Sequence, residues 1–226
     1  MIGIISDIHG NHAALLAVLA QLDRMGASEI FCLGDVGGYY SQINECCNAL
    51  RSRGIFSLMG NHDRCLVAGE TCPRSNSANT CLNHQRRVIT PDNLNWLTSF
   101  PSRSVIHGIQ MVHGGWQDPF DEYVTPSTDY FSAIPGSFFA SGHTHRPCLW
   151  SGIGKTYCNP GSVGQPRDGD SRAAFATWDD FSFSLHRVRY DILQTQREMA
   201  TAGFEPYYYE NLDQGAPIQG RNKKLE

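Results

Sequence analysis

Positive charge and long apolar runs are what this sequence has little of. Its 226 residues include 18 Lys and Arg against 22 Asp and Glu, which gives a formal net charge of −4. Nucleic-acid polymers and membrane surfaces are commonly bound through a basic patch, so neither is expected as a partner. No apolar run approaches the ~18 residues of a membrane span, and the start MIGIISDIHGNHAALL lacks the basic region and cleavage site of a signal peptide. We therefore expect a cytoplasmic protein.

The sequence also lacks any C-x-x-C pair, although it contains eight cysteines. Cys46 and Cys47 are adjacent, a spacing that suits neither a zinc knuckle nor an ordinary disulfide framework. In a cytosolic chain such thiols are expected to be reduced and mostly buried. It stays open whether Cys65, Cys72 and Cys81, which fall in one polar stretch, meet in space.

No Ser- and Gly-rich linker divides the chain, and this absence favours a single domain over residues 1–212. A chain of this length can bury one sizeable core. Residues 213–226 are polar and contain Gly and Pro, so a loose C-terminal tail is expected there.

Five short apolar runs each lead into a small residue beside Asp, Asn or His. Runs rich in Ile, Val and Phe without strict alternation predict buried strands. Glycine beside each polar residue permits tight turns and a close approach of the backbone. The runs IGIIS, IFCL, IFSLM, IQMV and FFAS lead into DIHG at 7–10, GD at 34–35, GNHD at 60–63, HGG at 113–115 and GHTH at 142–145.

Helical patterns separate the first of these strands. One helix is predicted over residues 12–25 with Gly26 as its C-terminal cap, and another over residues 42–53 with Ser41 as its N-cap. Alternation of strands and helices predicts α/β units with parallel strands. Ligands of such sheets bind outside the carboxyl ends of the strands, which is where all five polar blocks lie.

The second half of the chain predicts more antiparallel structure. Hairpins are expected around residues 107–108 and 179–180, and helices after Thr90 and after Asp191. The predicted fold class is α/β, with two mixed β-sheets packed face to face and helices outside.

The polar residues at the strand ends offer nitrogen and oxygen ligands without thiolate. Such a set suits Mn, Fe, Ni or Zn in a catalytic site better than structural zinc. One ion of four to six ligands cannot use them all, whereas two ions that share a bridging carboxylate can. Two metal ions about 3.5–4 Å apart activate a bridging water and clamp the oxygens of a displacement at phosphorus. The candidates, which predict phosphoester hydrolysis, are Asp7, His9, Asp35, Asn61, His62, Asp63, His113, His143 and His145.

The five blocks, in this order, resemble the calcineurin-like metallophosphoesterase superfamily. More narrowly, GYYSQINEC, VHGGWQDPFDEYV, GHTHRP and NPGSVGQPRDGD are similar to a small prokaryotic branch of predicted phosphodiesterases. The resemblance implies a four-layer αββα sandwich and two divalent ions per chain, with manganese expected and iron, nickel or zinc as alternatives. It implies that the first ion is bound by Asp7, His9 and His145, the second by Asn61, His113 and His143, and both by Asp35.

The resemblance also implies a catalytic pair and substrate contacts. His62 would protonate the leaving oxygen or stabilise developing charge, and Asp63 is expected to orient that imidazole. Asn11 would either touch a phosphate oxygen or cap a helix. Arg146 and Arg167 would either pair a substrate phosphate or form surface salt bridges.

The expected function is hydrolysis of small phosphodiesters, and of monoesters as a companion activity, by attack of a metal-bridging hydroxide. The expected partner is a small phosphoester or nucleotide. GDVGGYY lacks the arginine found in this block of protein Ser/Thr phosphatases and symmetric diadenosine tetraphosphate hydrolases, which argues against both. An asymmetric dinucleoside polyphosphate (Ap4A-type) hydrolase remains an alternative, as does a catalytically silent scaffold of the same fold.

Aromatic residues in the segment 115–135 leave one further question open. Their rings could stack on a substrate base or pack into the core. The residues concerned are Trp116, Phe120, Tyr123 and Tyr130.

Overall fold

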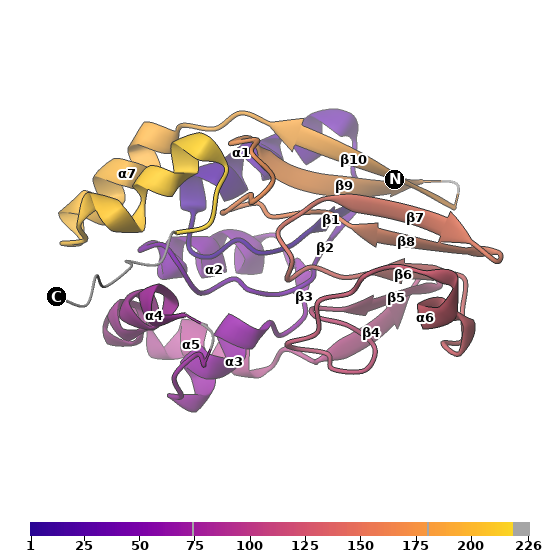
Figure 1. The fold of residues 1–226 in the computed structure, drawn as a ribbon. Helices are drawn as coiled ribbons and strands as arrows, with labels where there is room; N and C mark the ends of the chain where they lie inside the picture. The colour runs from indigo at the N-terminus through magenta and orange to yellow at the C-terminus, as the bar shows by residue number, and fades with distance from the viewer. Residues whose placement is uncertain (74, 180, 219–226) are drawn as a thin grey trace, which may run out of the picture.

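The computed structural model describes residues 1–73, 75–179 and 181–218, which contain two five-stranded β-sheets (Figure 1). The first sheet has the strand order β10-β9-β1-β2-β3. β1 (Ile2–Ile5), β2 (Glu29–Cys32) and β3 (Phe56–Ser57) run parallel, as predicted. β9 (Ala173–Asp179) and β10 (Ser182–Val188) form the expected second hairpin, which pairs antiparallel with β1.

The second sheet has the strand order β4-β5-β6-β8-β7. β5 (Ile109–Val112), β6 (Phe138–Ala140) and β8 (Lys155–Asn159) are parallel. β4 (Arg103–Ile106) and β7 (Cys148–Gly152) pair antiparallel at the two edges, and the turn between β4 and β5 is the hairpin expected around residues 107–108. Both sheets are therefore mixed, and each has three parallel strands.

The inner faces of the two sheets enclose an apolar core. Ile4 and Leu33 from the first sheet and its strand ends pack with Met111 and Ala140 from the second, and all four side chains are buried. Burial of one such large side chain stabilises the fold by about 1.5–3 kcal/mol. Past the strand ends, the His113 ring meets the backbone carbonyl of Leu33. The carboxyl ends of both sets of parallel strands thus meet at one edge of the molecule.

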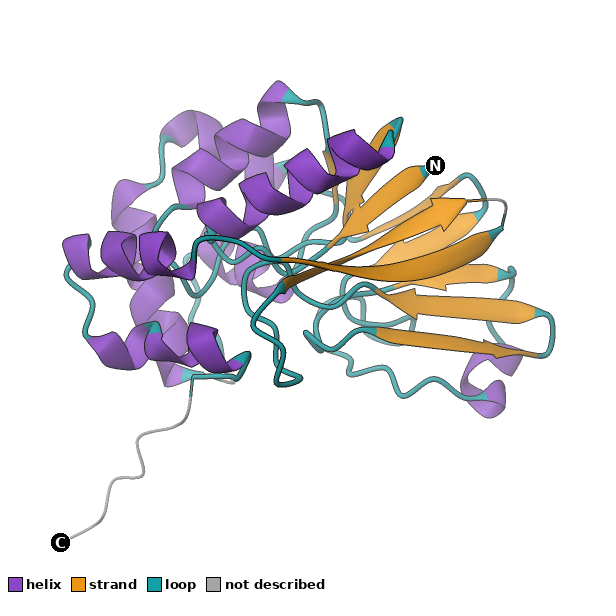
Figure 2. Cartoon of the chain, turned by 90° about the horizontal axis from the view of Figure 1, so that it is seen from above, coloured by secondary structure: helices purple, strands orange, loops and turns teal. Residues whose placement is uncertain are grey.

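Helices cover the outer face of the first sheet (Figures 1 and 2). α1 (His12–Met25) has the predicted bounds, and Gly26 ends it in the left-handed conformation (φ 77°). α7 (Ile192–Thr201) begins after the expected cap Asp191 and packs against α1.

Two further predicted helices lie beside the first sheet. α5 (Pro91–Thr98) begins after Thr90, whose hydroxyl accepts a hydrogen bond from Asn93 N–H. α2 (Ile43–Ser52) follows Gln42, which makes no side-chain cap, so the expected N-cap at Ser41 is wrong. The helix begins at Ile43, and its side chains Ile43, Cys46 and Leu50 are buried. Tertiary packing of this face stabilises a short helix more than a cap does.

Several elements were not predicted. α3 (Asn61–Ala68) begins inside the GNHD block, and α4 (Asn76–Val88) follows soon after it. Two short 3₁₀ helices, η1 (Pro206–Tyr208) and η2 (Glu210–Gln214), follow α7. These elements gather near the carboxyl ends of the parallel strands of the first sheet (Figure 1).

The outer face of the second sheet carries a thinner layer. The short α6 (Thr128–Ser132) packs with Trp116 against Phe139 and Tyr157, and α6 lies apart from the other helices (Figure 1). Trp116 and Tyr130 therefore belong to the core. The two sheets and their flanking helices form the αββα arrangement that the resemblance implies.

All eight cysteines are free thiols, and seven of them are buried, as predicted. Cys65 and Cys72 contact each other, and this contact, together with burial, raises the pKa of the Cys65 thiol. None of the helices in the described part of the chain combines the length and apolar character that a membrane span requires.

The segment expected to be a loose tail is built into the fold over its first part. Asp213 and Gln214 lie in η2, and Ile218 packs against a cluster that contains Tyr39 and Tyr40. Residues 219–226 of that expected tail, and Asp180 of the predicted turn, lie outside the described residues.

Candidate metal centre

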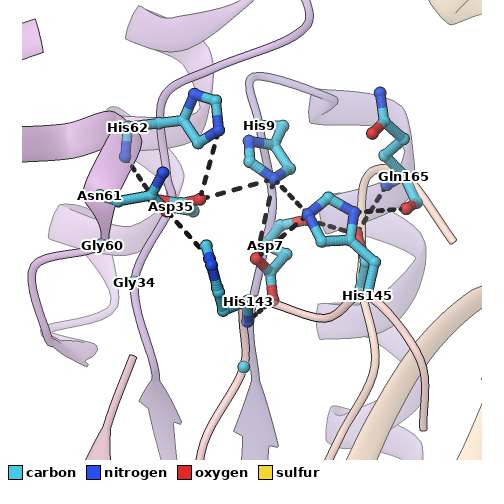
Figure 3. A network of polar contacts seen from close by, with 12 residues as sticks. Asp7, His9, Gly34, Asp35, Gly60, Asn61, His62, His143, His145 and Gln165 are labelled. Atoms are coloured by element: carbon cyan, nitrogen blue, oxygen red, sulfur yellow. Dashed lines mark hydrogen bonds and ion pairs between the residues drawn. The ribbon is translucent and has the colours of Figure 1, made fainter. Parts of the chain in front are cut away.

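The five polar blocks converge at the shared edge of the two sheets, each in the loop after a parallel strand. Figure 3 shows labelled residues of four of these blocks. The loops after β1 and β2 bind each other through the backbone, because Ile8 N–H and His9 N–H both donate to the Asp35 carbonyl at 2.8 and 2.9 Å. All seven predicted ligands are buried, with exposures of 0–5%. They are Asp7, His9, Asp35, Asn61, His113, His143 and His145.

Three of the histidines have their ring orientation fixed by backbone carbonyls. A carbonyl oxygen only accepts, so in each ring Nδ1 carries a hydrogen and Nε2 is turned toward the site, where it offers a lone pair whenever the ring is neutral. Carbonyl partners of this kind are what orient histidine ligands in metal sites. The Nδ1 bonds run from His9 to Gly37 (2.9 Å), from His113 to Leu33 (3.0 Å) and from His145 to Gln165 (2.6 Å).

His9 and His145 form the first ligand group with Asp7. Their Nε2 atoms are 3.0 Å apart. Asp7 Oδ1 lies 3.4 Å from His145 Nε2 and 3.7 Å from His9 Nε2, and it has no hydrogen-bond partner among the described residues. Two ring lone pairs and one carboxylate oxygen therefore face the same point, an arrangement that is stable only with a positive charge between them.

Burial sets the titration of this first group. Loss of solvent lowers the pKa values of His9 and His145 well below the usual histidine range. Burial also raises the pKa of Asp7 to about 6, against the opposing effect of His113. The two imidazoles are thus neutral at physiological pH, which is the form that binds metal ions.

Asp35 links the first group to a second one. The backbone N–H of His62 fixes Asp35 Oδ1 at 2.9 Å. Asp35 Oδ2 lies 3.4 Å from His113 Nε2 and 3.7 Å from His9 Nε2, without a hydrogen-bond partner in the described part of the chain. One carboxylate oxygen thus faces both groups, as a bridging ligand does.

Asn61 and two histidines complete the second group. Asn61 Oδ1 lies 3.1 Å from His113 Nε2 and 3.1 Å from His143 Nδ1. Burial lowers the pKa of His113, but the neighbouring Asp35 carboxylate more than offsets this and raises it to about 9. The second group therefore also attracts positive charge.

His143 and His145 come from one turn but belong to different groups, with Asn61 and His9 respectively. The backbone of this turn and of the DIHG turn is strained. Eight non-glycine residues with positive φ occur in the described chain, and five of them are predicted ligands. Each such conformation costs on the order of 1–3 kcal/mol and persists where the surroundings enforce it. The five are Asp7 (55°), His9 (54°), Asp35 (56°), His143 (65°) and His145 (59°).

Gly60 explains how Asp35 approaches the start of α3. A Cβ atom at this position would lie 2.0 Å from Asp35 Oδ1 and 2.4 Å from the Asp35 backbone nitrogen. No side chain fits that space. The glycine of GNHD is therefore required by the ligand geometry.

A cavity of about 180 Å³ opens onto both ligand groups. Ligands on its wall include Asp35, Asn61, His143 and His145, and His62 lies beside them. The remaining wall is formed by residues that the sequence analysis did not assign to the site, apart from Arg167 and Tyr123. They are Tyr39, Cys72, Ser75, Ser77, Tyr123, Arg167, Pro217 and Ile218.

Comparison with known proteins places this arrangement in a family. Residues 1–180 match the model of the calcineurin-like phosphoesterase superfamily domain. The chain belongs to this superfamily. Its members typically bind divalent metal ions, and the membership supports the prediction of a phosphoester hydrolase.

Individual relatives and solved structures are similar to this chain over most of its length. The chain is 34% identical over 220 residues to the uncharacterised protein MJ0912 of Methanocaldococcus jannaschii, covering 85% of this chain and 88% of the relative. A metallophosphoesterase structure from Sphaerobacter thermophilus matches with a TM-score of 0.84 and 31% identity, over 95% of this chain and 98% of that one. The hypothetical protein PH1004 of Pyrococcus horikoshii shares the fold, with a TM-score of 0.86 at 19% identity over 95% and 99% of the two chains.

In this member of the superfamily, His62 lies beside the predicted ligands with its ring packed on His9 and Tyr39, at centroid distances of 5.0 and 5.1 Å. Its Nε2 is 3.9 Å from Asp35 Oδ2 (Figure 3). Its Nδ1 has no hydrogen-bond partner within the described residues. The imidazole is thus placed next to the predicted metal ligands.

Asp63 does not orient that imidazole, and the predicted role is wrong. Its carboxylate accepts backbone N–H groups of Val36, Gly37 and Gly60 at 3.2, 2.8 and 3.1 Å. It therefore ties the loop after β2 to the start of α3. The residue acts on the backbone that carries Asp35, because a buried carboxylate satisfies several N–H groups at once.

Of the three predicted substrate contacts, only one lines the cavity. Asn11 is a buried helix cap whose Oδ1 accepts from Ala14 N–H at 3.2 Å, and it does not line the cavity. Arg146 is exposed, its Nε donates to the Arg167 carbonyl, and it does not line the cavity either. Arg167 does line it. The helix-cap alternative is therefore confirmed for Asn11, and Arg146 is not among the residues that line the cavity.

Proposed function

We propose that the protein is a phosphoesterase that uses two divalent metal ions to hydrolyse small phosphodiesters, with monoesters as companion substrates. One observation carries the proposal: the lone pairs of His9 and His145 face each other at 3.0 Å beside a buried, unpartnered oxygen of Asp7. A cation bound there would stabilise all three groups at once. Because the chain belongs to the phosphoesterase superfamily, we infer that this cation takes part in phosphoester hydrolysis.

Each of the two ligand groups described above would bind one ion. Asp35 would bridge the ions, since its Oδ2 faces both groups. Nitrogen and oxygen ligands without thiolate suit manganese, iron, nickel or zinc, and manganese is the first of these to test. The first ion would be held by Asp7, His9 and His145, and the second by Asn61, His113 and His143.

Two such ions would supply a water that ionises near neutral pH and would hold the phosphoester oxygens in place. The chain itself supplies an acid. His62 stands beside the ligands, nearly buried at 5% exposure, with its ring held by His9 and Tyr39. From there the imidazole would give a proton to the oxygen that leaves phosphorus.

Turnover of two chromogenic esters tests the proposal. Metal-stripped protein is assayed with bis(p-nitrophenyl) phosphate and with p-nitrophenyl phosphate, and Mn, Ni, Zn, Fe(II) and Mg are added back separately. We expect diester cleavage that depends on the added metal, highest with manganese. Cleavage of the monoester alone would overturn the assignment to phosphodiesters. Absence of turnover and of bound metal would favour the silent scaffold.

A further inference from the structure

One wall of the cavity carries polar side chains that are neither predicted metal ligands nor the predicted acid. Arg167 lies with its guanidinium carbon 5.3 Å from the centre of the Tyr39 ring. The Tyr39 ring in turn packs on His9 and His62. Ser75 and Ser77 join this wall and share a hydrogen bond of 3.0 Å between their hydroxyls.

Arg167 forms no ion pair with a carboxylate among the described residues, although its charge opposes the rise that burial causes in the pKa of Asp7. Its Nε and Nη2 both donate to the neutral Gln165 side chain, at 2.9 and 2.5 Å. Exposed arginines of the same chain do find acids, as Arg53 does with Asp23 and Arg172 with Asp170. A guanidinium held on a cavity wall without an acid is suited to an anionic ligand.

The Tyr39 hydroxyl belongs to the same polar group. The side chain is only 7% exposed. Side-chain interactions link this hydroxyl to Arg167 and Ser75. A phenol hydroxyl can donate a hydrogen bond beside the guanidinium.

The charges in the cavity, counted on the basis of the proposed function, indicate a role for this wall. Two divalent ions with Asp7 and Asp35 leave a net charge of +2 among the ligands, and a singly charged diester with an ionised water neutralises it. Arg167 then remains as an unmatched positive charge. We propose that Arg167, the Tyr39 hydroxyl and the hydroxyls of Ser75 and Ser77 form a subsite for a second phosphate of the substrate, next to the phosphate that reacts.

This subsite selects phosphoesters that carry a further phosphate close to the scissile one, as a pyrophosphate linkage does. Ser75 is also the N-cap of α4, a helix of 13 residues. The partial positive charge at that helix end adds to the field of Arg167. A substrate with one phosphate uses only the metal side of the cavity.

A matched pair of inert ligands tests the subsite. Methylphosphonate carries one anionic group, and methylenediphosphonate carries two. Their binding to manganese-loaded protein is measured by isothermal titration calorimetry for the wild type, Arg167→Met, Tyr39→Phe and, as a control, Arg24→Met, which changes an exposed arginine of α1. Thermal melting confirms that each variant is folded.

We expect Arg167→Met to weaken methylenediphosphonate about 10- to 100-fold, because charge-assisted hydrogen bonds are lost. Tyr39→Phe should weaken it about 3- to 10-fold. Methylphosphonate should change less than about twofold in both variants, and Arg24→Met should change neither ligand. The same pattern in KM would follow for substrates with and without a second phosphate.

Equal weakening of both ligands by Arg167→Met would overturn the inference, since Arg167 would then hold the reacting phosphate. Unchanged binding of methylenediphosphonate would overturn it as well. If methylphosphonate does not bind wild-type protein in a manganese-dependent way, the proposed function itself fails. The two failures are therefore distinguishable.

Discussion

At the scale of single residues, the site is defined by atoms that are buried without a partner. Asp7 Oδ1 and Asp35 Oδ2 have no hydrogen bond in the described part of the chain, although both side chains are at most 1% exposed. Leaving such an atom unsatisfied costs about 1–3 kcal/mol, and more for a charged group. Their positions beside histidine lone pairs make a bound cation the physical explanation.

Replacing Asp35 tests the shared ligand. In Asp35→Asn, the amide oxygen can still accept the His62 N–H, but an NH₂ group replaces Oδ2, which faces both groups. We expect the metal content of purified protein to fall at both positions together, as measured by elemental analysis. The exposed Asp92→Asn serves as the control. Loss of one ion with full retention of the other would refute the bridging role.

Replacing His62 separates catalysis from metal binding. His62→Ala removes the imidazole beside the ligands but none of the seven metal-binding side chains. We expect full metal content and a fall in kcat of about 10²- to 10⁴-fold, the usual contribution of a general acid. His107→Ala, which removes an exposed ring bonded to Glu29, is the control. Unchanged turnover of the His62 variant would exclude the acid role.

Sequence reasoning at this scale found the candidate ligands because they occur as blocks. D-x-H-G, G-N-H-D and G-H-T-H place the donors next to glycine, and the structure brings all seven together. It failed for Asp63 and Arg146, whose roles depend on which backbone group or surface lies near them. Adjacency in sequence to His62 did not predict that Asp63 would bond to Gly37, 26 residues away.

At the scale of secondary-structure elements, caps and loop anchors hold the ligands. Asn11 caps α1 and also donates to the Gly164 carbonyl at 2.9 Å, while its Oδ1 accepts the Thr195 hydroxyl at 2.8 Å. One side chain thus joins α1, the loop after β8 and α7. Asn159 does the same for the GHTH turn, since its amide donates to the Gly142 carbonyl at 2.6 Å.

Because Asn11 caps a helix, its replacement is expected to lower the free energy of unfolding without changing substrate binding. Asn11→Ala removes a helix cap and leaves Gly164 and Thr195 without their partner, so we expect a loss of about 2 kcal/mol in the free energy of unfolding. Urea denaturation measures this loss. The KM for bis(p-nitrophenyl) phosphate should stay within about twofold. A large rise in KM with unchanged stability would restore Asn11 as a substrate contact.

Replacing Asp63 is expected to lower the free energy of unfolding more than replacing Asn11 does, because this carboxylate anchors the loop after β2. Asp63→Ala leaves the N–H groups of Val36, Gly37 and Gly60 without their acceptor in a buried position. We expect a loss of about 3 kcal/mol in unfolding free energy, together with weaker metal binding because Asp35 is on the same loop. Asp63→Asn should recover part of the stability. Normal stability with reduced kcat would instead support the role of orienting His62.

Elements with a strong local signal were predicted well. α1 has the bounds expected from its apolar face and Gly26. α3 was missed because its start, GNHD, was interpreted only as a strand end, and α4 because its sequence, NSANTCLNHQRRV, is polar and buries few residues. Helices of this kind are stabilised by tertiary contacts that one sequence does not display.

At the scale of the whole molecule, two mixed sheets place six parallel strand ends at one edge. Three loops come from each sheet: those after β1, β2 and β3, and those after β5, β6 and β8. The alternation of strands and helices predicted the fold class, and the hairpins predicted the mixed sheets. The site lies where ligands of open α/β sheets bind.

The cavity wall is what the sequence could not predict. Pro217 and Ile218 reach the cavity from the far end of the chain, and Ser75 and Ser77 reach it from the start of α4. These contacts are set by the packing of distant segments, with no local motif. Tyr39 lies in the GYY block that carries the resemblance, so a signal was present, but its side chain had no evident partner until the fold was known.

The most direct test of the two-metal account is a crystal structure of the protein grown with manganese, with anomalous scattering measured near the manganese edge. The account predicts two anomalous peaks, one beside Asp7, His9 and His145 and one beside Asn61, His113 and His143, with Asp35 contacting both ions. A single peak, or none with the ligands in the same positions, would contradict it.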